Sequence, residues 1–176
     1  QRQMCIRDSS KTNTNIGKSP LFPKYETFAD FLSNTIIGKR KHTISEFFYR
    51  TQHIQQLGGY QIYPAGYYAD DASILLFCNN NGIASTEESL IVYRKSENNI
   101  SSSSCWNVEK SKAALKYYQW IIDEFPMKQQ DEQIIQQRLD FDLYTYFSAA
   151  LNIHQSIQIL NCIPVNIWNW KKKLLC

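Results

Sequence analysis

A thiol, two carboxylates and a basic side chain occur close together near the middle of the chain, at Asp70, Asp71, Cys78 and Arg94. A covalently held linear tetrapyrrole needs this combination. A thiol forms the thioether, a carboxylate accepts hydrogen bonds from the protonated pyrrole nitrogens, and a basic side chain pairs with the propionates. Aromatic side chains that would form rigid walls lie in the same region, at Tyr67, Tyr68 and Phe77. The pattern leads to the hypothesis of a tetrapyrrole attached through Cys78.

The cysteines of the chain, at positions 5, 78, 105, 162 and 176, form no CxxC pair and no Cys/His spacing typical of a zinc site. The three histidines are scattered as well, so no metal site is expected. An odd number of widely spaced cysteines favours reduced thiols in a reducing intracellular compartment. Cys105 and Cys162 are further candidates for pigment attachment. The alternative for Cys78 is a plain buried thiol after the apolar ILLF run.

Familiar catalytic motifs are lacking: the chain contains no GxGxxG, GxxxxGK(S/T), GxSxG or HExxH sequence. Adjacent acids occur at residues 70–71, 87–88 and 123–124, but neighbouring side chains do not converge on one point. We therefore expect a protein that is not an enzyme. One catalytic alternative stays open, a small enzyme in which Cys78 or His53 has a perturbed pKa in a cleft.

The composition is that of an ordinary globular protein, except for its aromatic content. Hydrophobic residues make up 43% of the 176 residues and charged residues 20%, which argues against wholesale disorder. Phe, Tyr and Trp together reach 14%. This content suits either a core rich in Tyr and Phe or aromatic anchors that face a partner protein.

The charge balance is mildly basic. A net charge of +3 falls short of a dedicated nucleic-acid binder and suits a subunit docked among acidic neighbours. Basic clusters at residues 39–41 and 171–173 are expected to be solvated turns or tails. No apolar run approaches the roughly 20 residues that span a bilayer, so a membrane-spanning protein is not expected.

The chain is expected to divide into an arm, two helical parts and a tail. Residues 1–9, QRQMCIRDS, resemble a translated sequencing adapter, and the polar stretch after them is expected to be an extended arm. A polar, Ser-rich linker separates a helical corner from a helical hairpin. The expected boundaries are 1–25 for the adapter-like segment and arm, 26–95 for the corner, 96–106 for the linker, 107–163 for the hairpin and 164–176 for the tail.

The most clearly marked segment of the corner is residues 38–59. Thr43 followed by Glu46 is a capping box, apolar positions follow at helical spacing, and Gly58-Gly59 supplies a left-handed stop. A helix is therefore predicted here, packed against a first helix over residues 26–37.

The rest of the corner is less regular. Residues 58–82 are expected to form an ordered loop rich in Tyr and Gly, in which the ILLFC run is a short strand or a buried helical turn. Ser85 and Glu88 form a second capping box, which predicts a helix to residue 95.

Two long helices are predicted in the second half. The first runs from Asn107, as the N-cap, to residue 125, where Pro126 stops it. The second spans residues 131–161 and either breaks near Asn152 or forms a long strut. The fold class expected is mostly α, an irregular helical domain with an ordered loop and a C-terminal antiparallel helix pair.

The segment GKRKHTISEFFYR, residues 38–50, resembles the helical turn of phycobilisome linker polypeptides. In that family a Gly-basic turn precedes a Thr/Ser-hydrophobic-x-Glu-Phe helix that ends in an arginine. Thr43 and Glu46 match the cap, Ile44 and Phe47 match the packing positions, and Arg50 matches the basic residue. The family's later Asn-Phe stretch and Leu-Leu-Gly-Arg turn have no counterpart here. The chain is therefore more similar to a red-algal, chromophorylated gamma-type linker of phycoerythrin.

This resemblance implies a rod linker on the stromal side of the plastid thylakoid that positions acidic phycobiliprotein subunits for light harvesting. It also implies a phycourobilin or phycoerythrobilin held by Cys78, with Asp70, Asp71 and Arg94 around the pigment. The alternative is an accessory helical subunit of another large complex, mitochondrial or ribosomal, without a cofactor.

Overall fold

The structure, a computed structural model, describes residues 22–40, 42, 44–79, 81–86 and 103–164, together with the backbone of short strands at 8–9 and 93–94. The chain is mostly α-helical, as predicted, and separates into two compact units. The N-terminal unit consists of the described residues within Gln1–Gln61 and Ala69–Glu97. The C-terminal unit consists of those within Ile62–Tyr68 and Asn98–Cys176. The boundary at residue 97 falls inside the expected linker, whereas Ile62–Tyr68 joins the opposite unit.

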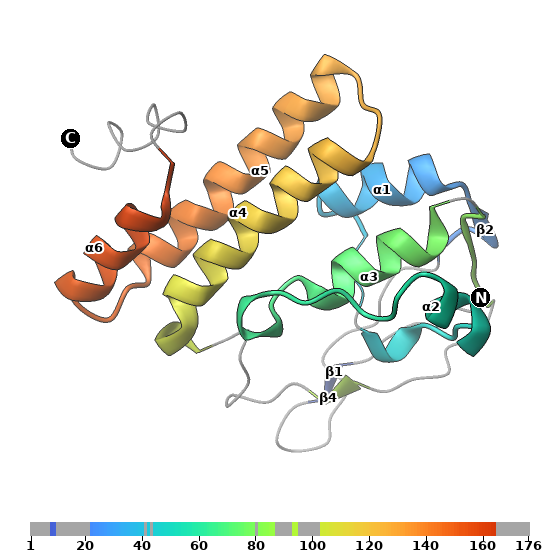
Figure 1. Ribbon diagram of the computed structural model, residues 1–176, viewed down its shortest axis with the longest axis horizontal. Coiled ribbons are helices and arrows are strands. Elements are labelled where there is room, and N and C mark those ends of the chain that lie inside the picture. Colours follow the sequence, from blue (N-terminus) through green and yellow to red (C-terminus); the bar gives the residue numbers. More distant parts are fainter. Residues whose placement is uncertain are drawn as a thin grey trace. The chain divides into compact units, whose positions relative to one another are not determined.

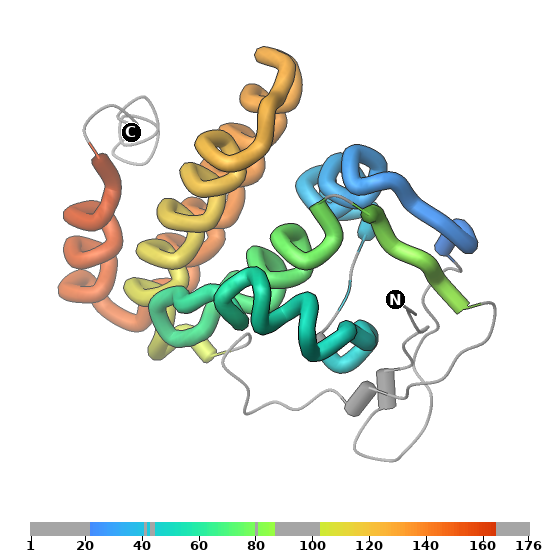
Figure 2. Tube along the Cα trace, turned by 45° about the vertical axis from the view of Figure 1, so that its right-hand side comes forward, coloured from blue at the N-terminus to red at the C-terminus, as the bar shows by residue number. Residues whose placement is uncertain are grey.

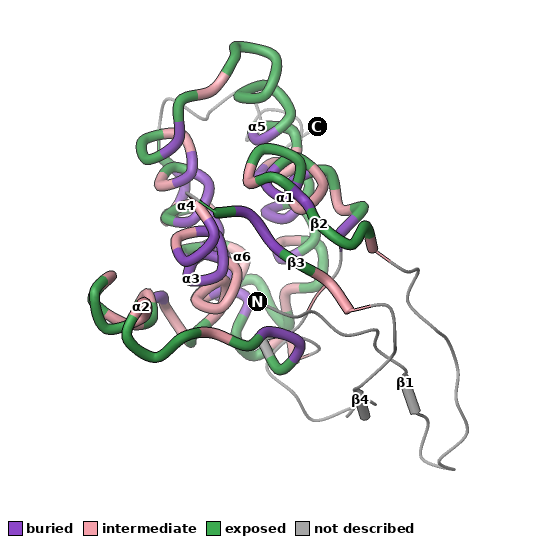
Figure 3. Tube along the Cα trace, turned by 90° about the vertical axis from the view of Figure 1, so that its right-hand side faces the viewer, coloured by how far each residue is buried: buried purple, intermediate pink, exposed green. Residues whose placement is uncertain are grey.

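In the N-terminal unit, helix α1 (Phe28–Ile36) contacts helix α3 (Ala69–Cys78). The Thr27 hydroxyl caps α1 by accepting a hydrogen bond from the amide of Asp30. Helix α3 is buried over most of its length, and Figure 3 shows it as the most enclosed segment of this unit. The core side chains come mainly from these two helices and the strand that follows them: Phe31, Ile74, Leu75, Phe77 and Ile83.

A short antiparallel ribbon closes this unit. Strand β2 (Tyr25–Glu26) pairs with strand β3 (Ile83–Ala84), with Glu26 opposite Ile83. Gly82 precedes β3 at a φ of +64°, and a Cβ at this position would clash with the carbonyl oxygen of Glu26. The turn therefore requires glycine. Strand β1 (Asp8–Ser9), inside the adapter-like segment, pairs in parallel with β4 (Tyr93–Arg94).

The single helix predicted over residues 43–59 is wrong. The chain forms a 3-10 turn, η1 (Ile44–Glu46), then an extended stretch, and only then helix α2 (Thr51–Gln56). Glu46 and Phe47 are both buried, so core packing sets the path of this segment in place of its local helix signals. Thr43 lies outside the described residues. The glycine stop is confirmed, because Gly58 and Gly59 end α2 with φ values of +81° and +86°.

The loop predicted over residues 58–82 is replaced over Ala69–Cys78 by the ten-residue helix α3, so of the two alternatives for the ILLFC run, strand or buried helical turn, the structure shows the helical one. The helix is apolar on nearly all sides, so its ILLFC run carries no helical period that could reveal it. Irregular structure is found over residues 57–68, with a 3-10 turn η2 at Pro64–Gly66, and again in the turn between α3 and β3. Of the helix predicted over residues 85–95, the first two residues are not helical and Tyr93–Arg94 forms β4. Residues 87–92 lie outside the described part.

The C-terminal unit contains the predicted helix pair. Helix α4 (Asn107–Glu124) follows a 3-10 turn η3 (Ser104–Trp106) and runs antiparallel to helix α5 (Gln129–Ser148) (Figure 1 and Figure 2). Helix α6 (Ile153–Cys162) packs against both. Among the described helices, none combines the length and apolar character that a bilayer crossing requires.

Two asparagines join the ends of these helices. Asn152 caps α6 by accepting a hydrogen bond from the amide of Gln155 at 2.9 Å, so of the two alternatives, a break near Asn152 or a long strut, the structure shows the break. Asn107 was predicted to be the N-cap of α4, but it is the first residue of the helix. Its Nδ2 donates to the carbonyl oxygens of Tyr146 (2.9 Å) and Ala149 (3.1 Å) at the C-terminal end of α5. It therefore satisfies carbonyls that the end of a helix leaves without partners.

We predict that Leu143→Ala lowers the free energy of unfolding of the C-terminal unit by about 2–5 kcal/mol. Leu143 is fully buried, so its truncation leaves a cavity. Urea unfolding followed by tryptophan fluorescence measures this unit, since all tryptophans fall within Asn98–Cys176. The matched control is Leu151→Ala, because Leu151 is exposed and its truncation should change stability by less than about 0.5 kcal/mol. Equal effects of the two substitutions would contradict the packing described.

Candidate functional site

Cys78, the expected pigment attachment point, is the last residue of α3 and is fully buried. Its Sγ donates a weak hydrogen bond to the carbonyl oxygen of Leu75 at 3.5 Å. Burial is the main cause that raises the pKa of this thiol to about 12. Because the thiolate is the form that attacks and becomes a thioether, the enclosed Cys78 is poorly suited to attachment in the folded chain.

The two carboxylates expected near the pigment lie in the first turn of α3, where they complement the helix dipole. Asp71 Oδ1 lies 2.9 Å from Nε2 of His42, whose ring packs beside the rings of Phe31 and Phe47. Asp70 Oδ1 accepts a hydrogen bond from the amide of Asp71. Burial, followed by the charge of Asp71, raises the pKa of Asp70. Both carboxylates therefore have partners within the N-terminal unit.

The other predicted members of the pigment site fall partly outside the described residues and partly in the other unit. The side chain of Arg94 lies outside the described part, and the expected walls at residues 67–68 belong to the C-terminal unit. Cys105 is exposed in η3, and Cys162 is half-buried in α6 of the same unit. The described residues thus do not fit a tetrapyrrole bound at Cys78. They also contain no cluster of three His, Cys, Asp or Glu side chains that could hold a metal ion.

A buried ion pair, which the sequence did not reveal, lies in the N-terminal unit. Arg40 Nη1 is 2.8 Å from Glu26 Oε2, and the two side chains are only 1% and 2% exposed. The guanidinium lies over the ring of Phe22, 3.7 Å from its centroid. Burial lowers the pKa of Arg40, while the charges of Glu26 and Glu46 oppose this shift. The prediction that residues 39–41 form a solvated turn is therefore wrong for Arg40.

A second buried polar cluster, centred on Asp142, lies in the C-terminal unit. Asp142 Oδ2 accepts hydrogen bonds from the hydroxyls of Tyr68 (2.8 Å) and Tyr118 (2.6 Å), and Oδ1 lies 3.5 Å from Arg138 Nε. The Tyr146 hydroxyl is 3.0 Å from that of Tyr68. Burial is the main cause that raises the pKa of all three tyrosines, so they remain protonated donors. The cluster ties residues 62–68 to α4 and α5, and its role is structural.

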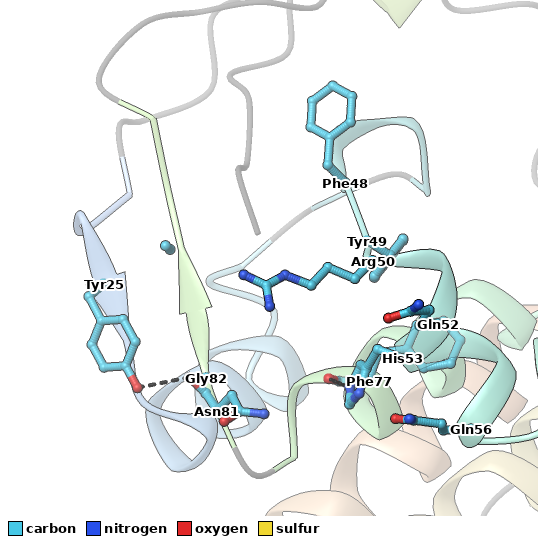
Figure 4. A pocket seen from close by; sticks show the side chains of 11 residues that line it. Tyr25, Phe48, Tyr49, Arg50, Gln52, His53, Gln56, Phe77, Asn81 and Gly82 are labelled. Atoms are coloured by element: carbon cyan, nitrogen blue, oxygen red, sulfur yellow. Dashed lines mark hydrogen bonds between the residues drawn. The ribbon is translucent and has the colours of Figure 1, made fainter.

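An open cavity of about 730 Å³ lies in the N-terminal unit between α2 and the β2–β3 ribbon. Figure 4 shows the Arg50 side chain extending from the start of α2 toward β3. Phe77 lines the cavity from α3, and its carbonyl oxygen lies 2.9 Å from His53 Nε2. Tyr25 lines it from β2 and donates from its hydroxyl to the carbonyl oxygen of Asn81. The cavity therefore combines one cation with aromatic walls.

The outer surface of the C-terminal unit carries a row of exposed apolar side chains. Ile134, Phe141 and Tyr144 lie on the solvent side of α5, and Ile153 and Ile157 lie on that of α6. Large apolar side chains gathered on one surface are typical of protein–protein contact sites. We call the three α5 side chains the α5 outer row.

Comparison with known proteins assigns no family: no protein-family model matches the chain, and neither a curated protein nor a solved structure shows significant similarity to it.

We predict that maleimide labelling at pH 8 modifies Cys105 at least about 100-fold faster than Cys78, because Cys78 reacts only through opening of the N-terminal unit. Cys162 should react at an intermediate rate, since it is half-buried and burial raises its pKa. Peptide mass spectrometry measures each rate. The three rates should converge in urea, and rapid labelling of Cys78 in the native chain would be incompatible with its burial.

We predict that Arg40→Met lowers the free energy of unfolding by about 3–5 kcal/mol, because it leaves Glu26 charged, buried and without its ion-pair partner. Urea unfolding measured by circular dichroism tests this, with Cys78 labelling as a readout for the N-terminal unit. The double variant Glu26→Leu/Arg40→Met removes both charges and should recover part of the loss. A double variant less stable than Arg40→Met would show that the unpaired charge is not the cause.

Proposed function

We propose that this protein is a non-catalytic linker subunit that holds neighbouring phycobiliprotein subunits of a light-harvesting assembly in position. We further propose that the α5 outer row is one of its docking surfaces. The observation that carries the proposal is the exposure of this row. The side chains of Phe141 and Tyr144 are 58% and 52% exposed on a helix whose opposite face is packed in the core.

The α5 outer row has the chemistry of an interface anchor. Aromatic side chains bury a large area with little loss of conformational freedom, and they dominate binding energies at protein interfaces. Arg138 lies between the members of the row on the same face, with its guanidinium 5.3 Å from the centroid of the Phe141 ring. Arginine next to aromatic rings is also typical of interface hot spots. Because Arg138 Nε also lies 3.5 Å from Asp142 Oδ1, its charge is used within the fold, and its contribution to docking is its packing beside Phe141.

The light-harvesting part of the proposal is supported by the resemblance of residues 38–50 to the helical turn of phycobilisome linkers. Phe47, at a packing position of that pattern, is buried, and Arg50, at its basic position, is exposed. The mildly basic balance of +3 also suits contact with acidic phycobiliproteins.

The alternative is an accessory subunit of another large complex, mitochondrial or ribosomal, without a cofactor. The enclosure of Cys78 favours this cofactor-free form. The same burial argues against a thiol-dependent enzyme, because His53 is bonded to the Phe77 carbonyl oxygen and the Cys78 thiol stays protonated.

We predict that the purified chain sediments with phycoerythrin hexamers and that Phe141→Glu weakens this binding about 10-fold or more, because it places a charge in the centre of the docking surface. The matched control is Phe48→Glu. The exposed fraction of Phe48, 55%, is similar to the 58% of Phe141. Because Phe48 belongs to the N-terminal unit, its substitution should leave binding unchanged. Analytical ultracentrifugation over a range of concentrations measures both affinities.

Two results would contradict parts of this proposal separately. A wild-type chain that does not bind the hexamers contradicts the light-harvesting role. A Phe141→Glu chain that binds like the wild type contradicts docking through α5. The chain isolated from its natural source can be denatured in acid urea, and its absorption spectrum and intact mass then separate a pigmented linker from the cofactor-free alternative. Peptide mapping identifies the cysteine that carries the pigment.

A further inference from the structure

The cavity of the N-terminal unit has an unbalanced charge. Among the described residues that line it, Arg50 is the only permanently charged side chain, and none of them is a carboxylate. Within the described part of the chain, no acidic side chain forms an ion pair with Arg50. This contrasts with Arg40 of the same unit, which Glu26 neutralises. The cavity therefore favours a negatively charged occupant.

Aromatic rings form part of the cavity wall. Tyr25 and Phe48 line its sides as exposed rings, while Phe77 contributes a buried ring that contacts that of Tyr49 at 5.1 Å between centroids. Exposed rings that face a common space bury apolar area when a planar molecule enters it. A volume of about 730 Å³ lies within the range of small-molecule sites in proteins.

Hydrogen-bond donors complete the lining. The side-chain amides of Gln52 and Gln56 come from α2, on the same side as Arg50. The Tyr49 hydroxyl is shielded from solvent and has no hydrogen-bond partner among the described residues. Burial raises the pKa of Tyr49 above its ordinary value, so the hydroxyl keeps its proton. Because the Tyr49 hydroxyl exposes almost no surface, the donors open to a bound molecule are those of Arg50, Gln52 and Gln56.

We propose that this cavity is a binding site for a small organic anion with a planar apolar body, such as an aromatic carboxylate or sulfonate. The Arg50 guanidinium pairs with the acidic group through its fork of N–H donors, and the body of the molecule lies against Tyr25 and Phe48. Arg50 is well placed for this contact. It precedes α2 in extended conformation, so its side chain leaves the backbone toward β3 (Figure 4).

The test uses two fluorescent probes that share an aromatic body and differ in charge. These are 8-anilinonaphthalene-1-sulfonate, which carries the acidic group, and N-phenyl-1-naphthylamine, which does not. Arg50→Gln should weaken binding of the sulfonate about 10-fold and leave binding of the neutral probe unchanged. Ala84→Trp, which fills the cavity from the exposed face of β3, should weaken binding of both probes.

The matched control is Lys39→Gln, which removes an exposed cation of the same unit that does not line the cavity. Its sulfonate affinity should equal that of the wild type. Probe bound to apolar side chains elsewhere, such as the α5 outer row, would be insensitive to both Arg50→Gln and Ala84→Trp. The proposal is overturned if the Arg50→Gln chain binds the sulfonate with the affinity of the wild type. It is also overturned if the Ala84→Trp chain does so.

Discussion

A buried carboxylate lies near the centre of each unit, and the surrounding elements are arranged so that it has a partner. In the N-terminal unit, Glu26 is held by Arg40, which brings the turn after α1 back to strand β2. In the C-terminal unit, Asp142 on α5 is held by hydroxyls from Tyr118 on α4 and from Tyr68 in the loop before α3. A buried charge without a partner costs several kcal/mol, so each pairing restricts the paths that the chain can take.

The helical hairpin gives the outer surface of α5 a fixed register. Leu139 and Leu143 hold the inner side of α5 in the core, and Asn107 ties the C-terminal end of α5 to the start of α4. The helix cannot rotate to hide its outer apolar side chains without exposing the inner ones. An exposed row held in this way is available to a partner before binding and loses little conformational entropy when the partner binds. This property suits a subunit whose proposed role is to position its neighbours.

Arg40 and Arg50 belong to the segment with the phycobilisome-linker resemblance, yet their environments differ. Arg40 is enclosed, lies over an aromatic ring and faces a carboxylate, so its charge is used within the fold. Arg50 faces an open cavity whose described lining contains no acidic residue, so its charge is available to a ligand. Sequence alone could not separate the two, because the difference depends on where Glu26 and the β2–β3 ribbon lie in space.

Local signals in the sequence determined the helical class, the pair formed by α4 and α5 and the glycine stop after α2, and they left a break near Asn152 as one of two alternatives. Each depends on residues that contact one another along the chain, such as the bond from Gln155 to Asn152. Only the tertiary structure decided that α3 is a buried helix, that residues 44–50 do not form one helix with α2, and that Cys78 is enclosed while Cys105 is exposed. The members of the predicted pigment site were grouped by sequence distance, and the structure encloses its thiol, Cys78. Burial and charge pairing depend on contacts between residues far apart in the chain, and these contacts can override local preferences because they contribute more free energy.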